Sequence, residues 1–323
     1  MDRMSLGVAP LPAAAKPFDV VGLGESSLDL VTVVEHFPAP DTKLVASAFE
    51  MLPGGQAATA VTACARQGFR ARYVGCLGSD AWGDLIHAAL VRERVDVAVV
   101  RRRGARSRMA IVIVERATGR RTVIEHRDAE QRLHPEELSA ALVTSGRVLL
   151  VDGTDVDAAT AAARAARAAG IPTVVDIERP GPGVDALLAE IDVLIVTGAF
   201  AAAWPGASSV SAGLAALAAR FQPAVAIATL GAAGSLARCR GQEIRTPAPT
   251  VRVEDTTGAG DAFRGGFVSG WLRFGPDVEV HTLLEYANAV AALNCVGVGA
   301  QTALPGRELV DALVTRTYRD QSK

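Results

Sequence analysis

The chain alternates short apolar runs with longer segments of helical character, and this alternation constrains its fold more than any other feature. The apolar runs, several of which end in Gly or Asp, cover residues 18–24, 72–78, 147–153, 171–177, 191–197 and 223–230. The segments between or after them are rich in Ala, Leu and charged residues, which favour helices. Repeated strand–helix–strand units predict an α/β protein in which helices cover both faces of a mainly parallel sheet.

Two segments, at about 30–52 and 106–127, break this rhythm. Each contains two runs in which β-branched or aromatic residues alternate with polar ones around a short turn, with no helix between the runs. We expect antiparallel ribbons that project from the main sheet as a lid, with one face wet and the other covered. The covered face could meet a substrate, a second subunit or both. Because a lid ribbon is exposed, we also expect a homodimer through the lid.

The composition is that of a soluble globular protein, since 50% of the 323 residues are hydrophobic and 21% are charged. The net charge of -2 gives no basic field for nucleic acid or anionic membrane, and no apolar stretch is long enough for a membrane helix. Residues 1–17 lack a signal-peptide core and predict a flexible tail before a single domain at 18–323. The four cysteines form no metal-binding or redox pair, which favours small buried side chains in a cytoplasmic protein.

Residues 255–263, which read DTTGAGDAF, combine two acids with five small residues. Aromatic residues recur at every fourth position from Phe263 on, which predicts a helix that begins within or just after the glycines. The unpaired N–H groups and the dipole at a helix start attract anions. The stretch therefore predicts an anion hole at Gly258, Ala259 and Gly260, which carry too little bulk to keep a phosphate away.

Asp261 is expected in the first turn of this helix, where its carboxylate would face the bound anion. Phosphoryl transfer to an alcohol needs donors for the charge on the transferring group and a carboxylate that accepts the hydroxyl proton. Asp261 is therefore the predicted general base. The alternative is that Asp261 only caps the helix and that the glycines only form a turn.

The DTTGAGD stretch resembles the second signature of the ribokinase, or PfkB, family of carbohydrate kinases. Residues 54–68 resemble the N-terminal signature of that family, a Gly-Gly pair that opens an Ala-rich helix, and residues 287–305 resemble its nucleotide and cation loops. The resemblance runs from about Phe18 to residue 305 in the expected order. It implies a ribokinase-like three-layer α/β/α sandwich with a small β-sheet lid, ATP and Mg²⁺ as cofactors, and a small sugar as the acceptor.

The resemblance also implies the sugar-binding residues. Residues 22–29 resemble the strand end whose Asp holds sugar hydroxyls, which assigns Asp29 to the substrate. Gly54 and Gly55 would let backbone amides approach the sugar, with Thr59 beside them. The alternatives are a surface Asp that begins the lid and a plain loop before a helix.

The nucleotide and cation residues follow in the same way. Residues 228–234 resemble the nucleotide loop of the family, which assigns Thr229, Gly231 and Gly234 to the ATP phosphates and places Asn288 near the adenine. Asp255 would ligate a monovalent cation such as potassium. From the residues alone, Asp255 could equally be an acid that stabilises its own turn.

The chain departs from the family pattern in two places. Thr59 replaces the usual Asn, and the surrounding sequence resembles the branch that contains sulfofructose kinase and ketohexokinase. Residues 197–200 read TGAF where many members carry N-x-x-E, so Mg²⁺ would rely on the nucleotide phosphates and water.

The basic run at 101–108 is either a solvated loop or the source of an arginine for an anionic substrate group. Arg108, Arg106 and, in the other ribbon, Lys43 are the candidates. No His spacing suggests a metal site. The remaining alternatives are a nucleoside kinase, a non-catalytic sugar or nucleotide sensor on the same fold, and a dehydrogenase, which GLGESS at 22–27 fits poorly because the third fingerprint Gly is missing.

Overall fold

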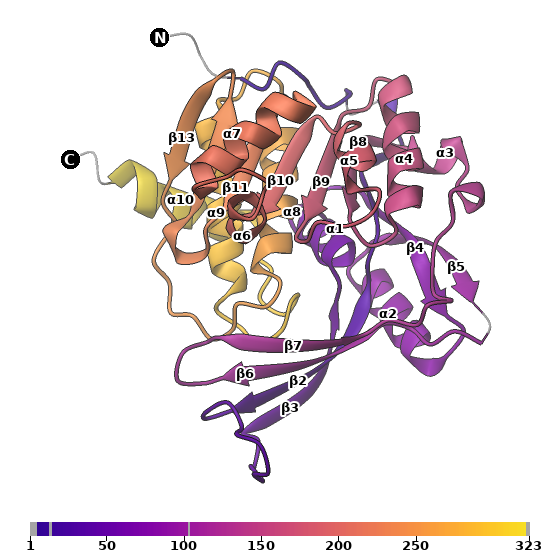
Figure 1. Cartoon of the computed structure of the whole chain (residues 1–323), viewed down its shortest axis with the longest axis vertical. Coiled ribbons are helices and arrows are strands. Elements are labelled where there is room, and N and C mark those ends of the chain that lie inside the picture. Colours follow the sequence, from indigo (N-terminus) through magenta and orange to yellow (C-terminus); the bar gives the residue numbers. More distant parts are fainter. Residues whose placement is uncertain (1–4, 13–14, 103, 321–323) are drawn as a thin grey trace.

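A nine-stranded sheet organises the protein, whose computed structural model describes residues 5–12, 15–102 and 104–320 (Figure 1). The strand order is β13-β12-β11-β10-β9-β8-β1-β4-β5, in which β11 through β5 are parallel and β12 and β13 form an antiparallel edge. The strands are β1 (Phe18–Leu23), β4 (Ala71–Gly78), β5 (Asp96–Arg102), β8 (Gly146–Asp152), β9 (Thr173–Ile177), β10 (Val193–Thr197), β11 (Val225–Thr229), β12 (Ser235–Cys239) and β13 (Gln242–Thr246). The predicted mainly parallel α/β sheet is confirmed.

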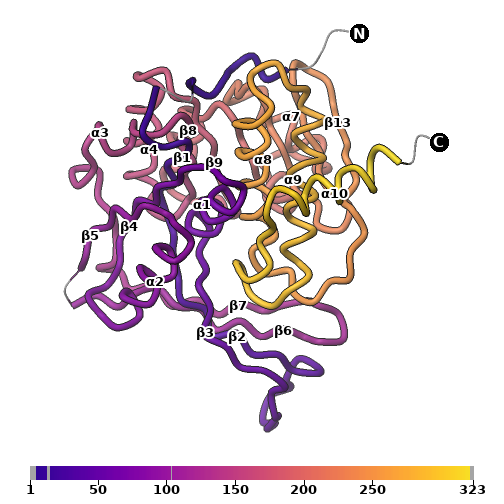
Figure 2. The backbone as a smooth tube through the Cα atoms, turned by 180° about the vertical axis from the view of Figure 1, so that it is seen from behind, coloured from indigo at the N-terminus to yellow at the C-terminus, as the bar shows by residue number. Residues whose placement is uncertain are grey.

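Helices cover both faces of this sheet, because successive strand residues point to opposite sides. In β1, Val20 joins the core beneath α1, α2, α8 and α9, whereas Val21 and Leu23 join the core beneath α3 through α7. Figure 1 views the α4 and α7 side, and Figure 2 shows α1, α8 and α9 from behind. The helices are α1 (Gln56–Arg66), α2 (Ala81–Arg92), α3 (Ala140–Val143), α4 (Val156–Ala168), α5 (Val184–Leu188), α6 (Gly198–Ala202), α7 (Val210–Phe221), α8 (Ala259–Phe274), α9 (Val280–Asn294) and α10 (Arg307–Val314).

A second, four-stranded sheet forms the predicted lid, in the order β3-β2-β6-β7. Its strands are β2 (Ser27–Val34), β3 (Ala48–Gly54), β6 (Met109–Glu115) and β7 (Arg121–His126). Both β2–β3 and β6–β7 are antiparallel, as expected, and the two ribbons join through the parallel pair β2–β6. In Figure 1 this sheet extends below the main sheet.

The lid has one covered and one bare face. Val31, Val33, Val112 and Val114 are buried on the covered face, with Val298 packed against them. On the other face, Met51, Leu30, Ile111 and Ile124 form one row across the four strands, and all but Leu30 are 40–56% exposed. A wet face and a covered face were expected, but the exposed face is apolar rather than polar.

The described part of the N-terminal stretch packs against the domain and is not a free tail there. Leu6 is 4% exposed in the core beneath α8 and α9, and the Leu11 N–H donates to the Arg147 carbonyl at 3.3 Å. Leu6 joins one core, and Leu11 packs against the other. Residues 1–4 and 13–14 of this predicted tail lie outside the described residues.

All four cysteines are buried and free, as expected. Among the described residues, we find no helix with both the length and the apolar character needed to cross a bilayer.

Candidate active site

Helix α8 begins where the glycine-rich stretch predicted. Its N-cap, Gly258, has the left-handed values φ 73° and ψ 1°, and a Cβ there would lie 2.6 Å from the carbonyl oxygen of Ala300. Glycine is therefore required twice, for its conformation and for its lack of a side chain. The Ala259 N–H donates to Thr256 at 3.3 Å. The next amides, of Gly260 and Asp261, lie in the first turn of the helix and so have no intrahelical acceptor, as the predicted anion hole requires.

Asp261 lies in the first turn of α8 with 9% of its surface exposed. Burial raises the pKa of this carboxyl to about 6, against the lowering effect of the Arg264 charge, while the negative charge of Glu178 raises the pKa further. A carboxyl with a pKa near 6 is ionised at neutral pH and is still a better proton acceptor than an ordinary Asp.

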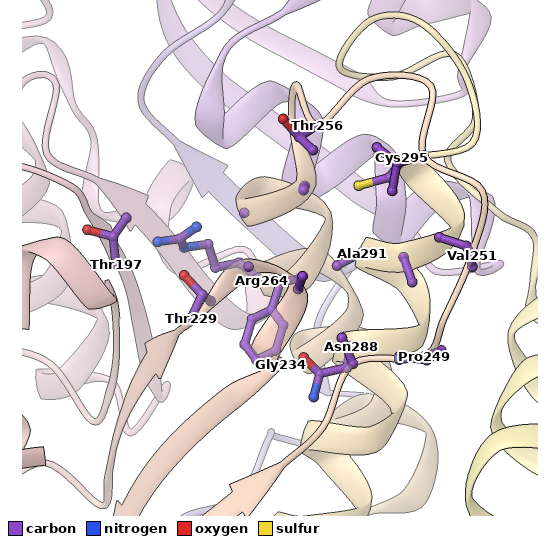
Figure 3. A pocket seen from close by; sticks show the side chains of 18 of the residues that line it. Thr197, Thr229, Gly234, Pro249, Val251, Thr256, Arg264, Asn288, Ala291 and Cys295 are labelled. Carbon is purple, nitrogen blue, oxygen red and sulfur yellow. The ribbon is translucent and has the colours of Figure 1, made fainter. Parts of the chain in front are cut away.

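A cavity of about 520 Å³ opens beside this turn (Figure 3). Ala259 and Gly260 line it, together with four residues predicted to bind the nucleotide: Thr229, Gly231, Gly234 and Asn288. Thr229 ends β11, so the cavity lies at the carboxyl end of the parallel sheet, where open α/β sheets bind ligands. Asn288 donates to Ser235 Oγ at 3.0 Å and to the Thr246 carbonyl at 3.3 Å, which ties α9 to the β12–β13 hairpin.

A smaller cavity of about 150 Å³ lies between the lid and the ends of β8 and β9. Glu125 and Arg127 reach it from the lid side, Thr154 from the loop after β8, and Glu178 and Arg179 from the loop after β9. Glu178 also lines the larger cavity. The two cavities therefore meet at Glu178, which is close enough to Asp261 to influence its pKa.

The predicted sugar residues cluster at the root of the lid but line neither of these two cavities. Asp29 lies within β2 rather than at the end of β1, and Gly54 leaves room for its carboxylate. Burial raises the pKa of Asp29 to about 6, although Ser27 Oγ donates to it at 2.7 Å. Gly55 follows with φ 93°, and Thr59 is fully buried with its hydroxyl accepting from Gln301 Nε2 at 3.1 Å.

The predicted anion-binding side chains lie elsewhere. Arg108 is 7% exposed, and its guanidinium approaches Asp155 at 3.7 Å and Glu25 at 4.0 Å. Arg108 therefore positions Glu25, which lines the smaller cavity. Lys43 is exposed in the β2–β3 connection, and Arg106 is exposed with its N–H donating to Asp128. Neither side chain lines either cavity.

Asp255 is fully buried and joins two loops. Its Oδ1 accepts from the N–H and the hydroxyl of Thr257 at 2.8 and 2.7 Å, and its Oδ2 accepts from the Gly299 N–H at 2.8 Å. This carboxylate stabilises its own turn, which is the alternative that the residues left open. It holds the loop before Gly258 against the loop that carries Ala300.

Comparison with known proteins identifies the family. The model of the pfkB family carbohydrate kinases matches residues 18–307. The chain belongs to this family. It is an ATP-dependent sugar kinase, a phosphotransferase with an alcohol acceptor, and this excludes the dehydrogenase alternative. A fructokinase of Klebsiella pneumoniae is 30% identical over 302 residues, which cover 85% of this chain and 94% of the fructokinase. A ribokinase of Haemophilus influenzae is 26% identical over 299 residues, which cover 88% of this chain and 95% of the ribokinase.

Solved structures agree with this pfkB kinase in fold. A putative ribokinase from Agrobacterium tumefaciens superposes with a TM-score of 0.85 at 23% identity and covers 93% of this chain and 98% of its own. The ribokinase of Arabidopsis thaliana, solved with ribose and ATP, gives a TM-score of 0.77 at 24% identity. The match covers 92% of this chain and 98% of that ribokinase. The ribokinase-like fold with a small lid sheet is thus confirmed.

The sequence analysis missed several charged residues of this kinase's site. Arg264 and Asp176 are buried beside Asp261, and Glu25 and Glu178 line the smaller cavity. Burial raises the pKa of Glu25 to about 7, against the lowering charges of Arg108 and Arg127. One signal was visible, because Arg264 interrupts an otherwise apolar run directly after the helix start. Glu25 and Glu178 follow the ends of β1 and β9, which is where a ligand would be met.

Proposed function

We propose that this pfkB kinase transfers the terminal phosphate of ATP to a primary hydroxyl of a sugar or sugar derivative. Asp261 acts as the general base, and residues 258–261 form the anion hole. The observation that carries the proposal is the position of Asp261. Its helix turn lines the larger cavity, and Glu178, which influences its pKa, lines both cavities.

In the proposed reaction the acceptor oxygen attacks the γ-phosphorus and forms the new P–O bond. The bond from that phosphorus to the β–γ bridging oxygen breaks, and its electron pair leaves with ADP. The hydroxyl proton passes to Asp261. The amides of Gly260 and Asp261, together with the dipole of α8, stabilise the charge on the transferring group.

Thr229, Gly231 and Gly234 are proposed to hold the nucleotide phosphates, with the adenine toward Asn288. Mg²⁺ prefers oxygen ligands and retains water. The Glu178 carboxylate and the Thr229 hydroxyl at the larger cavity suit it, although the 197–200 stretch offers no acid. Mg²⁺, held mainly by the phosphates and water, would neutralise phosphate charge.

Asp255 is proposed to ligate a monovalent cation such as K⁺. A carboxylate has about four lone-pair directions. The side chain of Asp255 accepts three hydrogen bonds, which leaves one direction for a cation.

The acceptor is proposed to lie between the lid and the carboxyl ends of β1, β8 and β9. Asp29, Gly54, Gly55 and Thr59 shape the lid root, and Arg108 acts through Glu25. The relatives of this chain include a fructokinase, a ribokinase and an aminoimidazole riboside kinase, whose names indicate different acceptors. A ketose or ketose derivative, as in the sulfofructose kinase and ketohexokinase branch, is the proposed class, and a nucleoside is the alternative.

A coupled ADP-release assay over ketoses, aldoses, their phosphates and sulfonates, and nucleosides tests this function. We expect one sugar class to give kcat/KM at least ~100-fold above the rest, because a site that hydrogen-bonds substrate hydroxyls discriminates strongly against acceptors that leave those bonds unmade. Turnover of nucleosides alone would support the alternative. If no acceptor raises ADP release above the buffer rate, the proposed transfer to a sugar hydroxyl is contradicted.

The bare face of the lid is proposed to form a homodimer. Met51, Ile111 and Ile124 form one cross-strand row, and Phe49 in the next row is 64% exposed. Such an apolar row on an exposed sheet face is typical of an interaction surface. It is separate from the covered face, so dimerisation would leave the acceptor site open.

The double variant Met51→Lys/Ile111→Lys is expected to raise the dimer Kd by at least ~30-fold, since charging central interface residues commonly costs 2 kcal/mol or more. Light scattering during size-exclusion chromatography measures the mass over a concentration series. The control is Leu309→Lys on α10, where an equally bare side chain is 61% exposed away from the lid. A monomeric wild-type protein, or equal shifts in both variants, would contradict the lid dimer.

A further inference from the structure

Arg264 is a charged side chain in the interior of helix α8, three residues after Asp261. It has no exposed surface, yet it lines the larger cavity next to Gly260. In Figure 3 its guanidinium extends from α8 toward Thr197 and Thr229 and away from Asn288. Arg264 thus points at the end of the cavity proposed for the nucleotide phosphates.

One side of the guanidinium is anchored. Its Nη2 approaches Asp176 Oδ1 at 2.6 Å, and both side chains are buried, at 0% and 2% exposed. Asp176 lies in β9, so the pair connects α8 to the central sheet. The guanidinium is planar, and its nitrogens keep fixed relative directions. The ion pair at Nη2 therefore restricts where Nη1 can point.

The other side has open donors. Among the described residues, no guanidinium nitrogen of Arg264 makes a hydrogen bond: Nη2 meets Asp176 as an ion pair, whereas Nε and Nη1 have no acceptor, although all three are buried. Nη1 lies against the first turn of α8, because a Cβ on Gly260 would come within 2.5 Å of it. Leaving buried charged donors unsatisfied is costly, so the arrangement calls for a ligand with several acceptor oxygens.

We propose that Arg264 binds the terminal phosphate of the nucleotide, with Asp176 paired at Nη2 while Nη1 donates to the phosphoryl oxygens. This inference rests on the proposed kinase reaction. In it, the Arg264 guanidinium adds a permanent positive charge to the proposed anion hole at residues 258–261. The 197–200 stretch, which reaches the same end of the cavity through Thr197, carries no acid to gather cations there. Arg264 supplies the charge that stabilises the phosphoryl group as it leaves ADP.

Nucleotide binding without any acceptor tests the proposal. Calorimetry compares ADP with the non-hydrolysable ATP analogue AMP-PNP, both with Mg²⁺. Arg264→Gln is expected to weaken AMP-PNP binding by ~10–100-fold, the worth of a charge-assisted hydrogen bond or two. ADP binding is expected to stay within ~3-fold, since ADP lacks the terminal phosphate. Arg264→Lys, which keeps the charge but loses the fork, should fall between.

The matched control is Arg273→Gln, on the same helix but at its far end, where Arg273 pairs with Asp311 at 2.5 Å. It should leave both affinities unchanged. Arg264→Gln leaves the buried Asp176 without its ion-pair partner and could fail to fold. The double variant Asp176→Asn/Arg264→Gln removes both charges and is expected to show the same loss of AMP-PNP affinity. Equal weakening of ADP and AMP-PNP, or no weakening in a folded variant, would overturn the phosphate role and leave a structural ion pair.

The two proposals can fail separately. If no acceptor is found but the preference for AMP-PNP over ADP depends on Arg264, the phosphate site is supported and sugar transfer is not. If a sugar is phosphorylated but discrimination is unaffected, the kinase function stands and the inference about Arg264 is wrong. In active protein, Arg264→Gln is further expected to lower kcat by ~10²–10³, as the loss of one oxyanion donor does.

Discussion

Asp261→Asn is expected to lower kcat by ~10²–10⁴ while the KM for the sugar changes less than ~3-fold. The amide keeps the size and polarity of the side chain but cannot take up the hydroxyl proton. The backbone N–H groups of the α8 start are untouched, so the nucleotide should still bind. Steady-state kinetics with the acceptor found by the panel, together with ADP calorimetry, measure both quantities.

The pH profile gives a second reading of the same group. Burial raises the pKa of Asp261 to about 6. Because the base must be ionised, the kcat of the wild-type enzyme should fall about tenfold per unit as the pH drops below 6 and should level off above it. The residual activity of Asp261→Asn should lack this limb. If the fall in kcat below pH 6 persists in the variant, the fall comes from another acid. Glu25, with its pKa of about 7, is the first candidate.

A matched variant separates catalysis from helix capping. Asp157 occupies the first turn of α4 as Asp261 occupies that of α8, but it is exposed, and its helix turn lines neither cavity. Asp157→Asn removes the same favourable contact with a helix dipole, worth ~0.3–1 kcal/mol. It should lower stability slightly and leave kcat intact. Equal kinetic effects in the two variants would mean that Asp261 is only a capping acid.

The fold was predictable where a strand is buried on both faces. The runs that became β1, β4, β8, β9, β10 and β11 are continuous and apolar, because each is covered by helices on both sides. The edge hairpin β12–β13 was missed. Its strands, SLARC and QEIRT, mix polar residues, and its turn is Arg240-Gly241, both with positive φ. Such a turn favours Asn-Gly, so Arg-Gly gave a weak signal.

The candidate site was predictable where its residues are local in the sequence. The proposed anion hole and Asp261 lie in one short stretch, and the first turn of a helix fixes their relation. Arg264 and Asp176 are far apart in the chain and meet only because α8 packs on the sheet beside β9. A single sequence cannot reveal that pairing. Arg108 was predicted to bind an anion because it lies in a basic run. In the structure its guanidinium is buried and faces Glu25 and Asp155.

Gly258→Ala is expected to destabilise the protein strongly. The residue has φ 73°, which costs a non-glycine residue ~1–2 kcal/mol. Its new Cβ would also lie 2.6 and 2.7 Å from the backbone O and Cα of Ala300, atoms that cannot rotate away. Forced backbone shifts of this kind cost a further ~1–3 kcal/mol. Thermal or urea unfolding should show a total loss of ~2–5 kcal/mol.

The same shift should reach the chemistry, because Gly258 is the N-cap that orients the amides of Gly260 and Asp261. We expect kcat to fall by ~10²–10³, the effect of displacing an oxyanion donor. Gly170→Ala isolates the conformational part: Gly170 follows α4 with φ 70°, and its Cβ would meet nothing within 4 Å. It should lose only ~1–2 kcal/mol and keep full kcat. If Gly258→Ala behaves no worse than Gly170→Ala in either assay, the Ala300 loop yields freely and the anion hole does not depend on this contact.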